Sequence, residues 1–144
     1  MDIWLVILIG LIGGASVGLQ SPIAGAMGQK VGGMAGSLII HVSGAIFSGI
    51  LLVLRGGENI KDWSTLPWYM FIAGVFGVIL YQTINVTLPR LGSTMMVALI
   101  IVGQLLMGVV IDHFGLLGVT TRPLDLSRVI GIAVLVLGAY LISK

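Results

Sequence analysis

The chain contains no cysteine and very little charge. The absence of cysteine from 144 residues excludes disulfide bonds, thiolate chemistry and any metal site with a cysteine ligand. Only 8% of the residues are charged and 58% are hydrophobic, whereas a soluble domain is about one quarter charged. The formal net charge of +2 is spread along the chain, so no basic cluster suggests nucleic acid. These scarcities exclude an ordinary soluble domain and favour a protein embedded in a bilayer.

Long apolar runs account for most of the sequence. Each is close to the ~20 residues that a helix needs to cross a hydrocarbon core of ~30 Å. The N-terminus lacks the positive segment and cleavage site of a signal peptide, so the first run is expected to be retained. The sequence predicts an all-α integral membrane protein with a single domain over residues 1–144. Its five transmembrane helices are expected at about residues 3–28, 33–54, 67–88, 93–112 and 127–143.

The basic residues are divided almost evenly between the two sides of this predicted topology. One side holds Arg55, Lys61, Arg122 and Arg128, and the other holds Lys30, Arg90 and Lys144. An excess of Lys and Arg normally fixes the cytoplasmic side, and four against three fixes almost nothing. The chain is therefore expected to insert in both orientations, so that two copies pair as an antiparallel homodimer. Such a pair supplies the inverted repeat on which many transporters are built.

The first apolar run carries a glycine stripe and then a proline. Gly10, Gly14 and Gly18 recur every four residues, which gives a smooth helix face where another backbone can pack closely. Pro22 is expected to interrupt this run. Broken helices often mark transporter sites, so the neighbouring Gln20 is a candidate substrate-binding residue. The alternative is a simple kink that lets the helix pack.

His41 is the only ionisable side chain near the middle of any run. Ionisable residues inside membranes are rare and usually face a cavity or a partner. Histidine changes charge near physiological pH, so His41 is a candidate for substrate binding or proton exchange. The alternative is a neutral histidine that is hydrogen-bonded within the bundle, since Ser37 lies one turn away.

Uncharged polar side chains in the third and fourth runs complete the candidate site. Tyr81, Gln82 and Asn85 lie together late in the third run, and Gln104 lies in the middle of the fourth. Amides both donate and accept hydrogen bonds, so they suit a neutral polar ligand. Residues of this kind equally hold transmembrane helices together, and the sequence leaves both roles open.

No catalytic or metal-binding pattern is present in the sequence. Asp112 and His113 are adjacent, but neighbours on a helix point in different directions, and this pair lies at a predicted membrane edge. A helix-terminating role at the interface is the better interpretation. No phosphate-binding loop, catalytic triad or metal-ligand spacing occurs. We therefore expect no enzymatic activity, no cofactor and no metal.

Several motifs resemble a known transporter family. They are Pro89-Arg90-Leu91-Gly92, Gly103-Gln104-Leu105, the run from Asp112 to Gly118, and Arg122-Pro123-Leu124. Together they resemble the five-helix YdcZ-like branch of the drug/metabolite transporter superfamily. The last third is also similar to small multidrug resistance exporters, whose final helix follows a Leu-Asp-Leu entry and has two glycines seven residues apart. That resemblance implies an antiparallel dimer contact at Gly131 and Gly138.

The resemblance implies transport, with one departure from the small exporters. Those proteins carry a glutamate in their first helix, whereas the first run here has no acidic residue beyond Asp2, so cationic-drug/proton antiport is not implied. The expected function is small-molecule transport, as an exporter that works by alternating access in the bacterial plasma (inner) membrane. The expected partners are the lipid bilayer, a second copy of the chain and a small-molecule substrate. The alternative is a non-transporting membrane subunit that assembles with a paralogue or another complex.

Overall fold

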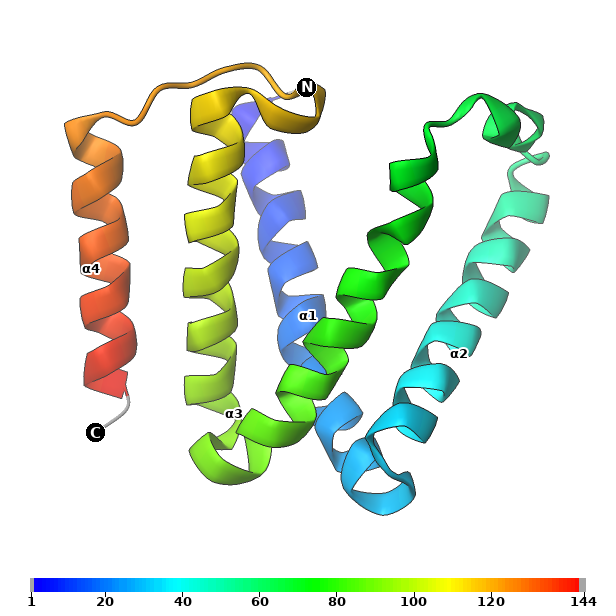
Figure 1. The fold of residues 1–144 in the computed structure, drawn as a ribbon, viewed down its shortest axis with the longest axis horizontal. Coiled ribbons are helices and arrows are strands. Elements are labelled where there is room, and N and C mark those ends of the chain that lie inside the picture. The colour runs from blue at the N-terminus through cyan, green and yellow to red at the C-terminus, as the bar shows by residue number, and fades with distance from the viewer. Residues whose placement is uncertain (1, 143–144) are drawn as a thin grey trace. The chain divides into compact units, whose positions relative to one another are not determined.

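The computed structural model describes residues 2–142, and every regular element in that range is helical (Figure 1). The elements in chain order are α1 (Ile3–Val31), α2 (Gly33–Leu54), η1 (Ile60–Thr65), η2 (Trp68–Ile72), α3 (Ala73–Phe114), η3 (Leu116–Gly118) and α4 (Leu126–Ile142). Three stretches are long and apolar enough to span a membrane, namely Ile3–Val31, Gly33–Leu54 and Trp68–Phe114, and α4 is a shorter apolar helix. The all-helical prediction is confirmed for the described residues.

The chain forms two compact units, Met1–Pro89 and Arg90–Lys144. The first contains α1, α2 and the beginning of α3, and the second contains the rest of α3 and α4. The prediction of one domain over residues 1–144 stays a prediction. Ser143, the last residue of the fifth predicted span, and Lys144 lie outside the described residues.

A single glycine joins α1 to α2. Gly32 has φ +91° and ψ 149°, a backbone conformation that glycine reaches without the strain imposed by a Cβ atom. Its N–H donates to the Gly28 carbonyl at 2.9 Å, and its own carbonyl accepts from the Gly36 N–H at 2.9 Å. These two hydrogen bonds finish one helix and start the next without an intervening loop. The two helices therefore pack as a tight hairpin in the first unit.

The interruption that was expected at Pro22 does not occur. The helical assignment of α1 runs without a break from Ile3 to Val31, three residues beyond the predicted end of the first span. Pro22 removes the backbone donor that would bond to the Gly18 carbonyl, yet the residues on both sides of it stay helical. Transmembrane helices tolerate proline within a continuous helix. The prediction of a broken helix beside Gln20 is wrong.

The 42-residue helix α3 contains a break at Gly92. An unbroken helix of that length would extend about 63 Å, roughly twice the hydrocarbon core. Gly92 has φ +74° and ψ 169°, which is not helical, and it separates residues 73–91 from residues 93–114. These segments correspond to the third and fourth predicted spans. The helix passes through Pro89, so the predicted end at residue 88 is wrong by a few residues.

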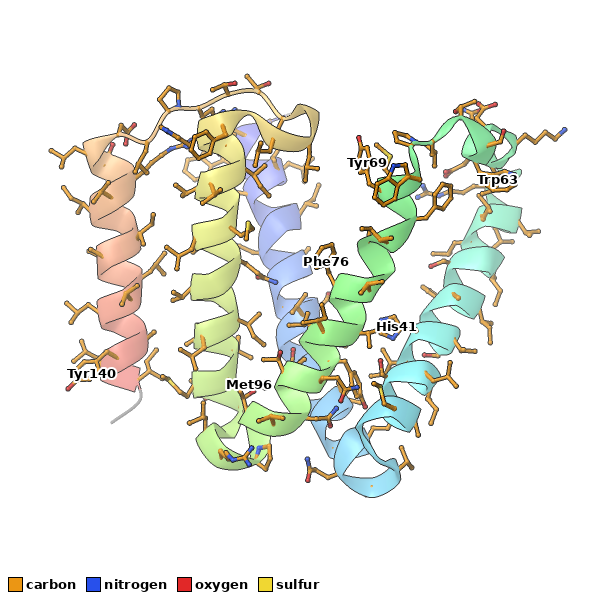
Figure 2. All side chains as sticks on the ribbon, viewed as in Figure 1. His41, Trp63, Tyr69, Phe76, Met96 and Tyr140 are labelled. Atoms are coloured by element: carbon orange, nitrogen blue, oxygen red, sulfur yellow. The ribbon has the colours of Figure 1, made fainter. Side chains whose placement is uncertain are left out.

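The surfaces of the helices in the first unit are apolar. Large side chains such as Leu11, Leu38 and Phe76 are 67%, 65% and 65% exposed, as expected for helices that contact lipid tails. Aromatic rings, Trp63 and Tyr69 among them, gather in the segment between α2 and α3 (Figure 2). Trp63 and Phe71 meet edge to face with ring centroids 6.2 Å apart. Aromatic residues are enriched at membrane–water interfaces. The fold therefore presents a lipid-facing surface with an interfacial end.

Candidate functional site

Tyr81 is buried where the beginning of α3 meets α1 and α2 in the first unit. The residue is 3% exposed, and its hydroxyl donates to the Ala24 carbonyl of α1 at 2.8 Å. The hydroxyl occupies the space that a Cβ atom on Gly36 of α2 would fill, and the same Cβ would lie 3.4 Å from the Gly28 Cα atom. Three helices thus converge on one phenol. This arrangement favours helix packing over substrate binding as the role of Tyr81.

Asn85 lies one turn further along α3 and has an unpaired oxygen. Its side-chain Nδ2 donates to the Tyr81 carbonyl at 3.1 Å, and its own backbone carbonyl accepts from Gln29 Nε2 at 3.1 Å. The side-chain Oδ1 lies against Gly28 and occupies the space that a Cβ atom on Gly28 would fill. This oxygen is buried and has no hydrogen-bond partner in residues 2–142. Native proteins leave few buried acceptors in that condition.

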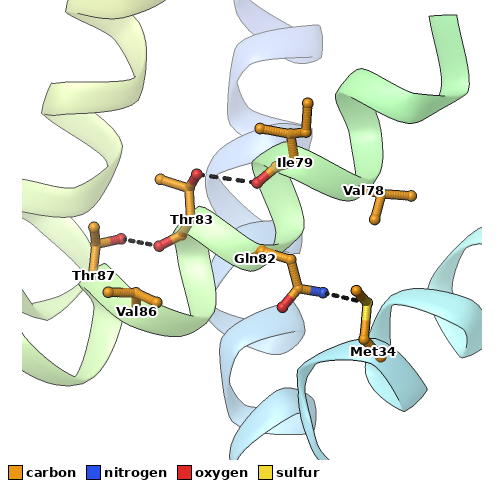
Figure 3. Close-up of a pocket in the computed structure, with 7 residues that line it drawn as sticks. All are labelled: Met34, Val78, Ile79, Gln82, Thr83, Val86 and Thr87. Carbon is orange, nitrogen blue, oxygen red and sulfur yellow. Dashed lines mark hydrogen bonds between the residues drawn. The ribbon is translucent and has the colours of Figure 1, made fainter. Parts of the chain in front are cut away.

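Gln82 is the polar residue of an apolar groove between α2 and α3. The groove has a volume of about 530 Å³ and is lined by Met34, Val78, Ile79, Gln82, Thr83, Val86 and Thr87 (Figure 3). Gln82 Nε2 reaches Met34 Sδ at 3.3 Å, and its Oε1 lies 2.5 Å from the position of an absent Cβ on Gly33.

The two threonines of this groove present no free hydroxyl donor. Thr83 donates to the Ile79 carbonyl at 3.0 Å, and Thr87 donates to the Thr83 carbonyl at 2.8 Å. Both bonds are formed within the same helix, one turn back. The Gln82 amide is therefore the polar group of this groove that faces another helix.

His41 lies at the same interface, two helical turns beyond Met34 on α2. Its Nδ1 is 2.6 Å from the Ser37 carbonyl, and Nε2 faces Gly77 of α3, 2.8 Å from the position of an absent Cβ (Figure 2). A carbonyl accepts only, so Nδ1 carries a proton, and in the neutral ring Nε2 is an acceptor. The seven-residue separation from Met34 corresponds to about 10 Å along the helix. His41 and Gln82 thus occupy two levels of one helix–helix interface.

Gln104 lies in the second unit. It lines a groove of about 340 Å³ together with Leu105, Gly108, Val109, Asp112, Arg128, Gly131, Ile132 and Leu135. At one end of this groove Arg128 Nη1 pairs with Asp112 Oδ2 at 3.5 Å and donates to the Arg122 carbonyl at 3.1 Å. His113 Nδ1 accepts from the Leu124 N–H at 3.1 Å. The adjacent Asp112 and His113 therefore make separate contacts that secure the loop between α3 and α4.

The remaining predicted positions have no close neighbour. Gln20 is exposed on α1, and no described residue makes a hydrogen bond to its side chain. No described atom lies within 4 Å of a Cβ placed on Gly10, Gly14 or Gly18 in α1, or on Gly131 or Gly138 in α4. These two glycine faces are open within one copy of the chain. Their roles in helix packing and dimer contact stay predictions.

Sequence reasoning missed the glycines that do make close contacts. The space beside Gly25 is taken by the Leu88 side chain, and Gly28, Gly33 and Gly36 receive the polar side chains of α3. The four-residue spacing of Gly28, Gly32 and Gly36 is visible in the sequence and matches the pattern of close helix packing. That spacing is the sequence signal that could have identified these close helix contacts.

The lipid-facing helices and the polar interface between two of them define a multi-pass helical membrane protein. A family described as "Putative inner membrane exporter, YdcZ" matches residues 5–141, which is almost the whole chain. The chain belongs to this YdcZ family and is a multi-pass protein of the inner membrane. Comparison with curated proteins and with solved structures gives no match. The predicted family resemblance is confirmed, and the wider superfamily stays a prediction.

Proposed function

We propose that the chain exports a small molecule by alternating access as an antiparallel homodimer. The observation that carries the proposal is the groove between α2 and α3, in which the Gln82 amide lies among apolar side chains. An apolar pocket with a few polar groups is the usual form of a small-molecule site. His41 extends this polar interface further along α2. Membership of a family described as an exporter agrees with this reading.

The antiparallel arrangement is supported by charge and by open helix surfaces. The four-to-three division of basic residues gives little preference for one orientation. Gly131 and Gly138 are seven residues apart, so they lie within about 20° of one another around α4. Both are open in a single copy, which leaves room for a second helix. A pair of oppositely oriented copies would then place two α2–α3 grooves in inverted positions.

Cysteine crosslinking distinguishes antiparallel from parallel pairing, and the native chain has no cysteine to interfere. In an antiparallel α4 contact, position 131 of one copy lies opposite position 138 of the other. Co-expressed Gly131→Cys and Gly138→Cys chains should therefore form a mixed disulfide dimer in membranes, and Gly131→Cys alone should crosslink poorly. Disulfides require Cβ atoms about 4 Å apart, so the readout is specific for direct contact.

Ala133→Cys with Val136→Cys is the matched control for this experiment. These positions have the same midpoint along α4 as the glycine pair but lie on the opposite face of the helix. They should give no mixed dimer. Efficient crosslinking of Gly131→Cys with itself, or equal crosslinking of the control pair, would contradict the antiparallel contact through the glycine face.

A further inference from the structure

We infer that the exporter site recognises a neutral molecule with an N–H or O–H donor on an apolar body. This inference rests on the proposed function and specifies the substrate class of that site. It follows from comparing the hydrogen-bond donors and acceptors at the α2–α3 interface of the first unit. The hydroxyl donors there are paired and each amide uses one of its two N–H groups, whereas three side-chain acceptors have no donor.

Three hydroxyl donors of the interface are directed at protein atoms, and each of the two amides directs one of its two N–H groups at a protein atom. Tyr81, Thr83 and Thr87 each donate a hydroxyl to a backbone carbonyl. The two amides behave alike, because Gln82 Nε2 reaches Met34 Sδ and Asn85 Nδ2 reaches the Tyr81 carbonyl. A ligand that offers only acceptors would therefore meet one available side-chain donor on the groove lining, the second N–H of Gln82.

Three acceptors at the same interface have no donor among residues 2–142. They are Gln82 Oε1, Asn85 Oδ1 and, in the neutral ring, His41 Nε2. Gln82 is on the groove lining, His41 is two turns away along α2, and the Asn85 oxygen is buried beside Gly28. Unpaired acceptors in an apolar setting are costly, so a ligand that donates to Gln82 Oε1, the acceptor on the groove lining, gains more than it would in water. The interface is thus complementary to a donor group.

Charge at this interface argues against ionic ligands. Neither residues 33–54 nor residues 73–89 contain Lys, Arg, Asp or Glu. A carboxylate or phosphate would meet acceptors without a compensating cation, and an ammonium ion would lose its hydration without a carboxylate partner. The remainder of the groove is formed by side chains such as Val78, Ile79 and Val86, which suit an apolar body. A neutral amphiphile with a donor head matches both features.

The inference is tested with four fluorinated probes that share one aromatic ring. They are 4-fluorobenzamide, which has two N–H donors, its N,N-dimethyl derivative, which has none, 4-fluorobenzoate, and 4-fluorobenzylammonium. Fluorine NMR line broadening is measured with the full chain in lipid nanodiscs, and empty nanodiscs correct for partition into lipid. The primary amide should bind at least threefold more tightly than the dimethyl amide, as expected for one or more added hydrogen bonds. The anion and the cation should bind more weakly than the primary amide.

Two variants locate the binding within the groove. Gln82→Met keeps the length of the side chain but removes the acceptor, and it should weaken the primary amide about three- to tenfold. Binding of the dimethyl amide should not change, which also reports that the groove is intact. Ser43→Ala is the matched control, because Ser43 lies in α2 outside the groove lining and its hydroxyl donates to the Ile40 carbonyl, so both amides should bind as to the native chain.

Several results would overturn the inference. They are equal binding of the two amides, a preference for either ion, binding of the primary amide that Gln82→Met does not change, or no excess broadening for any probe. None of these bears on the crosslinking of α4. A failed probe series with a positive glycine-face crosslink would reject the substrate class alone, whereas the converse would reject the antiparallel dimer alone.

Discussion

Replacing Gly36 with alanine should destabilise the first unit, because the added methyl group would meet the Tyr81 hydroxyl. The new Cβ would also lie 3.0 Å from Tyr81 Cζ and 3.4 Å from the Gly28 Cα atom, so neither neighbour has room to spare. Overpacking of this kind costs about 1–3 kcal/mol. Displacing the phenol would also weaken its bond to Ala24, worth about 1 kcal/mol. The better helix propensity of alanine offsets about 1 kcal/mol of this cost. The net loss is about 1–3 kcal/mol.

The free energy of unfolding can be measured in mixed micelles as the fraction of denaturing detergent rises, with tryptophan fluorescence as the signal. Gly44→Ala is the matched control, since Gly44 is in the same helix and has no described atom within 4 Å of its absent Cβ. It should be stabilised by up to about 1 kcal/mol through propensity alone. The free energies of unfolding of the two alanine variants should therefore differ by about 1–4 kcal/mol, with Gly36→Ala the less stable.

A double-mutant cycle identifies the phenol as the cause of the loss. In a Tyr81→Phe background the nearest atom to the new methyl group is absent, so Gly36→Ala should cost less by about 1 kcal/mol. Equal stabilities for Gly36→Ala and Gly44→Ala would refute the packing of Tyr81 against Gly36. A cost that Tyr81→Phe leaves unchanged would assign the strain to the Gly28 backbone instead.

Two further predictions concern titratable groups. Asp125 Oδ1 accepts from the Arg128 N–H at 2.8 Å and from Ser127 Oγ at 3.0 Å, and these bonds hold the pKa of the Asp125 carboxyl below its ordinary value. The stabilisation that these two hydrogen bonds give to the N-terminus of α4, the Asp125 cap, is therefore fully present above the ordinary carboxyl pKa of about 3.9. It is lost as the pH falls through the lowered pKa of Asp125. At neutral pH, Asp125→Ala should speed hydrogen exchange of the Arg128 amide and Asp62→Ala should not; equal rates would contradict the cap. His41→Phe removes the Nε2 acceptor that faces Gly77, so binding of 4-fluorobenzamide should weaken, whereas His113→Phe should leave it unchanged. Equal binding to the two variants would exclude His41 from the site.

The positions of the helices follow closely from the sequence, whereas the end of α1 and the end of the helical segment before Gly92 do not. Run length and hydropathy identify α2 to the residue, because polar or glycine residues flank it on both sides. The two prolines misled the prediction, since Pro22 and Pro89 both lie within continuous helix. The breaks occur instead at Gly32 and Gly92, where φ is positive and a Cβ atom would be strained. Backbone conformation, rather than a missing donor, decides where these helices end.

The candidate site could be predicted in composition but not in the role of each residue. The sequence identified the polar residues of the third run and left binding and packing open for all of them. Tyr81 bonds to a carbonyl 57 residues away and Gln29 bonds to one 56 residues away, and a periodic pattern contains no information about such pairs. Gln82 is separated from these contacts because it is one residue further around the helix and faces Met34. A difference of about 100° around α3 thus distinguishes a packing residue from a groove residue.

The unpaired side-chain oxygen of Asn85 also affects the free-energy difference between the observed helix packing and any alternative packing. A buried acceptor without a partner costs about 1–3 kcal/mol, and the hairpin geometry around Gly28 imposes that cost on the present arrangement. Any arrangement in which α1 withdraws and water reaches this oxygen recovers the same amount. That recovery changes the ratio of the two populations by a factor of about 5 to 150. Asn85 therefore lowers the stability of the packed first unit relative to any arrangement that hydrates its side-chain oxygen.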